Sequence, residues 1–182
     1  MRVFVFGQKW LGEQVVRGLI EDGHAVAGIA CPVDDRIYRE AEALGVRYWW
    51  GNEDAAGNPE AIPDGTDLIV SAHSFDFIRR GVRAQARLGA IGYHPSLLPR
   101  HKGRRSVEDT IAAGDTEAGG TVYRLTDSMD GGPIIMQRRC AVLAGESAGE
   151  LWRRALAPLG VAMLRDVVTA IGLRDGMRAD AA

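Results

Sequence analysis

The stretch VFVFGQKWLGEQVVRGLIEDG, residues Val3 to Gly23, decides the fold class. It begins with four apolar residues, all β-branched or aromatic, and Gly7 ends that run, which is typical of a short buried strand. Apolar side chains then recur at helical spacing from Leu11 to Glu21, before Gly23 closes the pattern. The stretch therefore predicts a strand followed by a helix, which is the first unit of an α/β fold.

The same alternation of strand and helix continues as far as Tyr93. The expected strands are Ala25–Cys31, Val46–Trp50, Leu68–Ala72 and Ala90–Tyr93, and the expected helices are Arg36–Leu44 and Gly81–Leu88. A stretch rich in Asn, Asp, Gly and Pro before Leu68 predicts a loop. Because these strands are apolar without alternation, we expect a mostly parallel sheet that helices cover on both faces.

The second half of the chain predicts a different arrangement. We expect a helix at Val107–Ala113 and then two strands, Gly120–Leu125 and Pro133–Val142, joined by the turn-rich TDSMDGG. Strands joined so closely predict an antiparallel addition to the sheet near the C-terminus.

The C-terminal part of the chain carries the pattern of a capped helix. Ser147, with Glu150 three residues later, has the spacing of a capping box, which predicts a helix from Ala148 to about Ile171. We expect residues 1–173 to form a single domain and residues 174–182 to form a flexible tail.

Composition limits the class of protein. The 22 Lys and Arg residues nearly balance the 24 Asp and Glu residues, which predicts no binding of nucleic acid or of an anionic membrane by the chain as a whole. The two cysteines, Cys31 and Cys140, match no metal or disulfide spacing, so we expect no metal site and a reducing compartment. Because no uninterrupted apolar run approaches the length of a membrane span, we expect a cytoplasmic protein without signal peptide.

Three segments follow predicted strands at the edge where an open parallel sheet binds ligands: Gly7–Gly12, His73–Ile78 and His94–Gly103. The first, GQKWLG, has two glycines without the spacing of a dinucleotide-binding loop. A glycine turn that lets strand and helix pack closely explains it equally well. His73 is a further residue that this placement brings to the edge of the cleft.

The segment IGYHPSLLPRHKG, Ile91 to Gly103, fixes a histidine beside a proline. Pro95 restricts His94 to extended geometry, although a lone histidine is more often structural than catalytic. Asp130, in SMDGGPIIMQ, would by itself be read as a turn residue. Paired with His94, it supplies an acid and a base for proton transfer at a carbonyl centre.

HPSLLPRHKG, followed some thirty residues later by DGGPIIMQ, resembles the family of enzymes that use 10-formyltetrahydrofolate. That family includes glycinamide ribonucleotide, methionyl-tRNA and sugar N-formyltransferases and the formyltetrahydrofolate hydrolases. FGQKWLGEQVV, EDGHAVAGI and SFDFI look most like the hydrolase domain of 10-formyltetrahydrofolate dehydrogenase. The resemblance implies a Rossmann-like formyltransferase fold, 10-formyltetrahydrofolate as formyl donor and no metal.

The resemblance also implies roles for particular residues. His94 would polarise the formyl oxygen and stabilise a tetrahedral intermediate, while Asp130 would keep that histidine charged and relay protons through water. Phe77 and Ile78 would border the pterin of the folate. The loop expected to offer it backbone hydrogen bonds contains Leu125, Thr126, Asp127, Met129 and Asp130. A cis peptide bond at Leu98–Pro99 is implied as well.

Gly92 departs from the pattern of the family. Transferases usually carry asparagine two residues before the histidine, and the hydrolase domain carries an aliphatic residue there, whereas glycine supplies no side chain. Loss of one such donor typically costs about 3 to 4 kcal/mol of barrier. Either Gln8, Lys9 or an ordered water fills the space, or the enzyme is slow or catalyses altered chemistry. A purely structural role, in which Gly92 eases strand packing, is the further alternative.

The acceptor is expected to bind near Gln8, Lys9 and Trp10, and near Arg104 and Arg105. GQKWLG replaces the serine- and asparagine-rich phosphate loop of the glycinamide ribonucleotide enzyme, which disfavours purine synthesis. Arg104 and Arg105 belong to a basic run that includes His101; most such runs are solvated faces, but this one begins at the catalytic motif and favours an anionic acceptor. His101 itself is expected to be a solvated loop residue.

The sequence thus predicts an enzyme that transfers a formyl group from 10-formyltetrahydrofolate to an amine of a small acceptor. Hydrolysis of the same donor to formate and tetrahydrofolate is the enzymatic alternative. Gly92 leaves open a degenerate folate-binding or regulatory protein, against which the presence of both His94 and Asp130 argues. The sequence indicates no oligomeric state.

Overall fold

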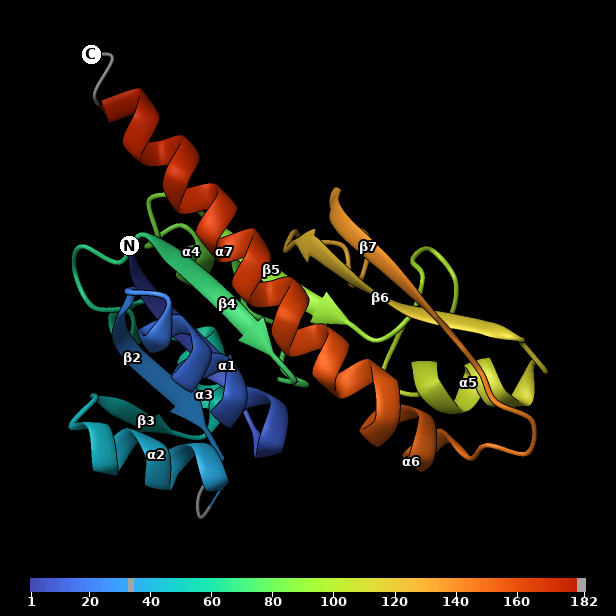
Figure 1. Cartoon of the computed structure of the whole chain (residues 1–182). Coiled ribbons are helices and arrows are strands. Elements are labelled where there is room, and N and C mark those ends of the chain that lie inside the picture. The colour runs from blue at the N-terminus through green and yellow to red at the C-terminus, as the bar shows by residue number, and fades with distance from the viewer. Residues whose placement is uncertain (33–34, 180–182) are drawn as a thin grey trace.

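The computed structural model describes residues 1–32 and 35–179, in which one seven-stranded sheet carries helices on both faces (Figure 1). The strand order is β3-β2-β1-β4-β5-β6-β7. Pairings from β3 through to β5 are parallel, and those of β5 with β6 and of β6 with β7 are antiparallel. The strands are β1 (Arg2–Gly7), β2 (Ala25–Cys31), β3 (Tyr48–Trp50), β4 (Leu68–Ala72), β5 (Ala90–His94), β6 (Glu117–Arg124) and β7 (Ile134–Ala141). The predicted mostly parallel sheet, with helices on both faces and an antiparallel addition, is confirmed.

Strand β1 shows why the parallel strands lack alternation. Val3 and Val5 belong to the core under α1 (Lys9–Glu21) and α7 (Ala157–Ala179), which Figure 1 shows packed on the same face of the sheet. Phe4 and Phe6 point to the opposite face and pack in a second core, which includes residues of α3 (Asn52–Gly57) and α4 (Arg80–Arg83). Because both faces are buried, the four positions from Val3 to Phe6 are all apolar.

The first turn confirms the packing interpretation of GQKWLG. A Cβ atom on Gly7 would lie 3.1 Å from the carbonyl oxygen of Ala72 and 3.2 Å from Cα of Gly12. Strand β1, strand β4 and helix α1 therefore approach more closely than a side chain permits.

Helix boundaries differ from the predictions between β3 and β5. Helix α2 (Arg36–Leu44) has the expected bounds, but α3 and a 3-10 turn at Pro59–Ala61 occupy the stretch expected to be a loop. Ala55 and Ala56 are buried in the second core, so tertiary packing outweighs the local Gly, Asn and Pro content. Helix α4 is one turn long, shorter than the expected helix at Gly81–Leu88.

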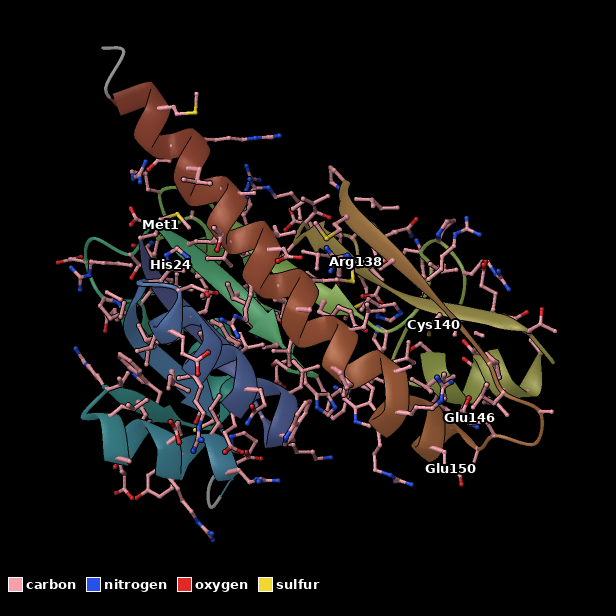
Figure 2. All side chains as sticks on the ribbon, in the orientation of Figure 1. Met1, His24, Arg138, Cys140, Glu146 and Glu150 are labelled. Carbon is pink, nitrogen blue, oxygen red and sulfur yellow. The ribbon has the colours of Figure 1, made fainter. Side chains whose placement is uncertain are left out.

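The last helical segment is longer than predicted. Its start has the expected capping box, in which the Ser147 hydroxyl accepts from the Glu150 N–H; Glu150 is labelled in Figure 2. The segment comprises α6 (Ala148–Leu151), a π turn (Trp152–Leu156) and α7. Helix α7 continues to Ala179, so residues 174–179 of the expected flexible tail are helical, and residues 180–182 lie outside the described residues. Between β5 and β6 lies α5 (Ser106–Ala112), one residue offset from the expected helix.

One helical segment, Ala148–Met177, is long and apolar enough to cross a membrane by length and composition. Charged residues such as Arg165 and Asp166 interrupt this segment, so no uninterrupted apolar run marks it in the sequence. The buried residues Met163, Leu164 and Val168 of α7 pack against the sheet and α1, as in the core helix of a globular protein, so the property is weak evidence for a span.

Candidate active site

A cavity of about 430 Å³ lies where β1, β4 and β5 end. The arrowheads of β4 and β5 point the same way in Figure 1, toward the edge at which ligands bind in open parallel sheets. The predicted site residues that line the cavity are Lys9, Phe77, Ile78, His94, Arg104, Leu125, Thr126, Met129 and Asp130. All three predicted segments thus contribute to one cavity.

Five predicted site residues do not line the cavity: Gln8, Trp10, Gly92, Arg105 and Asp127. The Gln8 side chain is buried in the protein, and Trp10 is exposed. Arg105 is exposed at the start of α5 and makes no capping hydrogen bond. Asp127 turns outward and pairs with Arg83. Residues before or after a cavity-lining residue often point elsewhere, which sequence position alone does not reveal.

His94 and Asp130 face each other, as predicted. Nδ1 of His94 lies 3.7 Å from Oδ2 of Asp130, and both side chains are more than nine-tenths buried. The distance is too long for a direct hydrogen bond. A water that bonds both groups would lie to one side of the line between the two atoms. A proton acceptor and a potential donor thus converge on one point of the cavity.

The Asp130 carboxylate is held by two donors. The Tyr123 hydroxyl donates to Oδ1 over 2.8 Å, and the Gly103 N–H donates to Oδ2 over 2.8 Å. Burial raises the pKa of Tyr123, so its hydroxyl keeps the proton that it donates. The sequence does not predict that Tyr123 bonds Asp130, because a tyrosine in a strand carries no local sign of such a contact.

The orientation of His94 decides which of its nitrogens carries a proton. Nε2 of His94 lies 2.9 Å from the carbonyl oxygen of His101. Because a carbonyl only accepts, Nε2 must be the protonated nitrogen of the neutral ring, and Nδ1 has a hydrogen only in the charged ring. His101, expected to be solvated, is instead half-buried and bonded to Asp115 over 2.7 Å.

The His94 loop is tied to the antiparallel strands. Leu98 N–H donates to the Thr121 hydroxyl over 3.1 Å, and the Gln137 side chain donates to the Leu98 carbonyl over 2.8 Å. The Leu98–Pro99 bond is cis, as the resemblance implied. Ahead of the loop, the Tyr93 hydroxyl donates to the Leu156 carbonyl over 2.7 Å. These bonds fix the position of the residue between them, His94.

Left-handed backbone gathers at the cavity. Four residues other than glycine have positive φ in the described chain: Lys9 (55°), His73 (64°), His101 (47°) and Asp130 (47°). Three of them line the cavity, and the fourth bonds the His94 ring. Such conformations are costly for residues with a Cβ and concentrate at functional sites.

The space beside Gly92 is filled by neither Gln8 nor Lys9. A Cβ on Gly92 would lie 2.8 Å from Cδ2 of Leu125, so a leucine methyl occupies the position where a side chain would begin. Lys9 places its Nζ over the Phe75 ring instead. The atoms nearest to this position belong to Leu125 and Ser71, so the candidates Gln8 and Lys9 do not occupy it.

Arg83 shapes the loop predicted to meet the pterin. It is buried and donates to the carbonyl of Ile78 and to the carboxylate of Asp127. Its guanidinium also lies 5.8 Å from the Phe77 ring centroid. Arg83 therefore joins the two predicted folate-binding segments. The sequence does not predict this role, because no motif distinguishes Arg83 from the other arginines of its helix.

Residues 54–168 match the formyl transferase family. The chain belongs to that family. Among relatives of this chain, cytosolic 10-formyltetrahydrofolate dehydrogenase of Homo sapiens is 33% identical over 175 residues, which cover 88% of this chain and 19% of that protein. Methionyl-tRNA formyltransferase of Rhodopirellula baltica is 31% identical over 161 residues, covering 86% of this chain and 47% of that protein. The chain spans about a fifth of the dehydrogenase.

Solved structures share the fold of this chain. Glycinamide ribonucleotide transformylase 1 from Symbiobacterium toebii aligns with a TM-score of 0.81 at 22% identity, over 93% of this chain and 86% of that chain. A likely sugar N-formyltransferase from Mycobacterium tuberculosis gives a TM-score of 0.70 at 21% identity, over 96% and 68%. The family match includes His94 and Asp130 but begins after Lys9.

Proposed function

We propose that this formyl transferase moves a formyl group from 10-formyltetrahydrofolate to an amine of a small acceptor. The observation that carries the proposal is the buried pair of His94 Nδ1 and Asp130 Oδ2, 3.7 Å apart, on the wall of a cavity at the carboxyl edge of the sheet. Attack on a formyl carbon develops negative charge on oxygen and positive charge on the amine, so it needs a donor and a proton acceptor together.

The reaction forms a bond between the amine nitrogen and the formyl carbon and breaks the bond from that carbon to the folate nitrogen. The proton lost by the amine ends on the released folate nitrogen. Because Nε2 of His94 donates to His101, Nδ1 donates to the formyl oxygen only when the ring is charged. Asp130, whose two carboxylate oxygens accept from Gly103 and Tyr123, stabilises that charge and accepts the proton of the amine through water.

The cavity suits the formyl donor. Its volume of about 430 Å³ lies in the range of small-molecule sites. Exposed apolar side chains, Phe77 and Met129, border it beside the polar backbone of residues 125–130. A flat heterocycle with donor and acceptor edges matches that combination of apolar surface and main chain.

Hydrolysis of the same donor is the second candidate, and one observation favours it. The Leu125 methyl group fills the space at Gly92 where transferases would place an amide donor. The wall is therefore aliphatic at this point, as the resemblance leads us to expect of a hydrolase domain. With water as nucleophile, the products are formate, tetrahydrofolate and a proton. The degenerate folate-binding alternative is disfavoured by the paired His94 and Asp130.

The test measures formate and tetrahydrofolate released from 10-formyltetrahydrofolate, with and without a panel of small amines. We expect His94→Asn to lower turnover by roughly 10² to 10⁴, the usual contribution of a positioned acid or base. His24→Asn is the matched control, because His24 lies against Thr169, away from the cavity. Unchanged turnover in folded His94→Asn protein would reject the role of His94 in either reaction. No release by the native protein, with or without amines, would reject both activities, and release without amine would favour hydrolysis.

A cytoplasmic location and the single domain over residues 1–173 stay predictions. We infer that the acceptor carries negative charge, for which Arg104, the one arginine of the predicted pair that lines the cavity, gives support.

A further inference from the structure

Five side chains from four parts of the chain form one wall of the cavity, here called the Phe75 cluster: Lys9, His73, Phe75, Arg104 and Trp152. Lys9 begins α1, His73 and Phe75 follow β4, Arg104 precedes α5, and Trp152 begins the π turn. Ring centroids lie 5.2 Å apart between His73 and Phe75 and 4.8 Å apart between His73 and Trp152. The Phe75 ring is 42% exposed, although it lies among these neighbours.

Two cations of the cluster meet on Phe75. Nζ of Lys9 lies 6.0 Å from the ring centroid, and the Arg104 guanidinium carbon lies 5.7 Å from it. Arg104 also donates to the Phe75 carbonyl over 2.9 Å. Across the described residues, neither cation has a carboxylate within 4.0 Å, whereas Arg83 and Arg100 each pair with an aspartate.

Two acids also line the cavity, Asp76 and Glu108. Asp76 interacts with the Ser74 hydroxyl, and neither acid forms an ion pair with Lys9 or Arg104. Among the described residues, the cluster therefore presents two positive charges outside any ion pair, beside an accessible aromatic face. An anion attached to a flat or apolar group would satisfy both features.

The backbone aims these groups at the cavity. Lys9 and His73 both have left-handed φ, and the Lys9 N–H donates to Asp35 over 2.7 Å. Nδ1 of His73 is buried without a hydrogen-bond partner. Burial, with a smaller contribution from Lys9, lowers the pKa of His73 to about 4, so its ring is neutral at pH 7. The neutral ring packs against Phe75 and Trp152.

We propose that the Phe75 cluster is the acceptor subsite, in which Lys9 and Arg104 hold a phosphate or carboxylate and Phe75 packs against the body that bears the amine. The assignment rests on the proposed function. Arg104 follows Gly103, whose N–H anchors Asp130, so the subsite adjoins the reacting pair. The glutamate of the folate carries the same anionic chemistry, and the experiment separates the two sources.

The probes are phenyl phosphate and inorganic phosphate, titrated calorimetrically into the full chain. We expect phenyl phosphate to bind more tightly than inorganic phosphate, and Arg104→Gln to weaken both by roughly tenfold, as for loss of a charged hydrogen bond. Phe75→Leu should remove the preference for phenyl phosphate and leave inorganic phosphate binding within twofold. Arg105→Gln is the matched control, because that exposed neighbour does not line the cavity, and it should change neither affinity.

Equal losses in Arg104→Gln and Arg105→Gln would overturn the subsite, because they would show only a general effect of charge. Tetrahydrofolate titration supplies the second arm. An Arg104→Gln protein that binds tetrahydrofolate at least tenfold more weakly but phenyl phosphate normally would also overturn it, in favour of the folate glutamate. Binding needs no turnover. A cluster that binds phenyl phosphate in a protein without formyl chemistry would therefore reject the proposed function and, with it, the acceptor role, leaving an anion-binding site.

Discussion

The reacting pair and the Phe75 cluster differ in how completely the protein satisfies their polar groups. Asp130 accepts from Tyr123 and Gly103, and His94 is bonded to the His101 carbonyl. In the Phe75 cluster, by contrast, neither Lys9 nor Arg104 has a carboxylate of a described residue within 4.0 Å, and Nδ1 of His73 is buried with no hydrogen-bond partner among those residues. The first region is preorganised by the fold, as catalysis requires. The second leaves bonds for a ligand to make, which suits selection of an acceptor.

The largest effect is expected for Asp130→Asn, which should change catalysis without changing binding at the Phe75 cluster. The amide keeps an oxygen for one donor but loses the charge beside His94, so we expect kcat to fall by roughly 10² to 10⁴. Phenyl phosphate affinity should stay within twofold, because the Phe75 cluster is intact. Calorimetry and steady-state rates on the same preparation measure the two quantities. A parallel loss of both would show that the regions are not separate.

A second prediction concerns the acid stability of the Phe75 cluster. The pKa of His73 is about 4 in the folded chain and about 6.5 when unfolded, so the unfolded chain binds the proton first as pH falls. The contribution of neutral His73 to the free energy of unfolding is fully present above about pH 6.5. It falls by about 3 kcal/mol as the pH is lowered from about 6.5 to 4. His73→Asn, in which asparagine tolerates left-handed backbone, removes that titration.

Urea unfolding of both proteins at pH 7.5 and pH 4 measures the difference. We expect the free energy of unfolding of His73→Asn, relative to that of the native chain, to rise by about 3 kcal/mol between the two pH values. Parallel pH profiles would mean that the buried nitrogen of His73 finds a partner that this structure does not show.

The third prediction concerns the space between Gly92 and Leu125. Gly92→Asn alone must displace the Leu125 methyl, 2.8 Å from the new Cβ, so it should weaken folate binding as well as add a donor. Combined with Leu125→Ala, the amide has room. We expect the double variant to transfer formyl groups at least about tenfold faster than Leu125→Ala, since an oxyanion donor is restored. Equal rates would show that the formyl oxygen does not lie beside this position.

The smallest effect is expected at the start of α6, behind Trp152. Ser147→Ala removes the side-chain cap that Glu150 reciprocates, which should cost about 1 kcal/mol of stability. Turnover at 25 °C should stay within twofold, because the capping bonds do not touch the cavity. Thermal unfolding and steady-state rates test this. A large loss of phenyl phosphate affinity would instead show that the cap positions Trp152 in the Phe75 cluster.

The sequence by itself determined the repeated strand and helix units, because apolar periodicity and terminating glycines such as Gly23 and Gly45 act over a few residues. It also identified His94 and Asp130, since their motifs contain the prolines and glycines that shape each loop. Even here the helix α3 escaped prediction, because Ala55 and Ala56 form it by packing against a sheet that the local pattern does not contain.

Only the tertiary structure decided what surrounds the pair. Leu125 fills the space at Gly92 because β5 and β6 are neighbours, and Lys9 and Arg104 meet at Phe75 from segments far apart in the chain. Adjacent arginines diverge, so Arg104 lines the cavity while Arg105 faces solvent. The physical reason is the same in each case: side-chain direction and long-range proximity depend on backbone angles and strand pairing, which the order of residues encodes only through the complete fold.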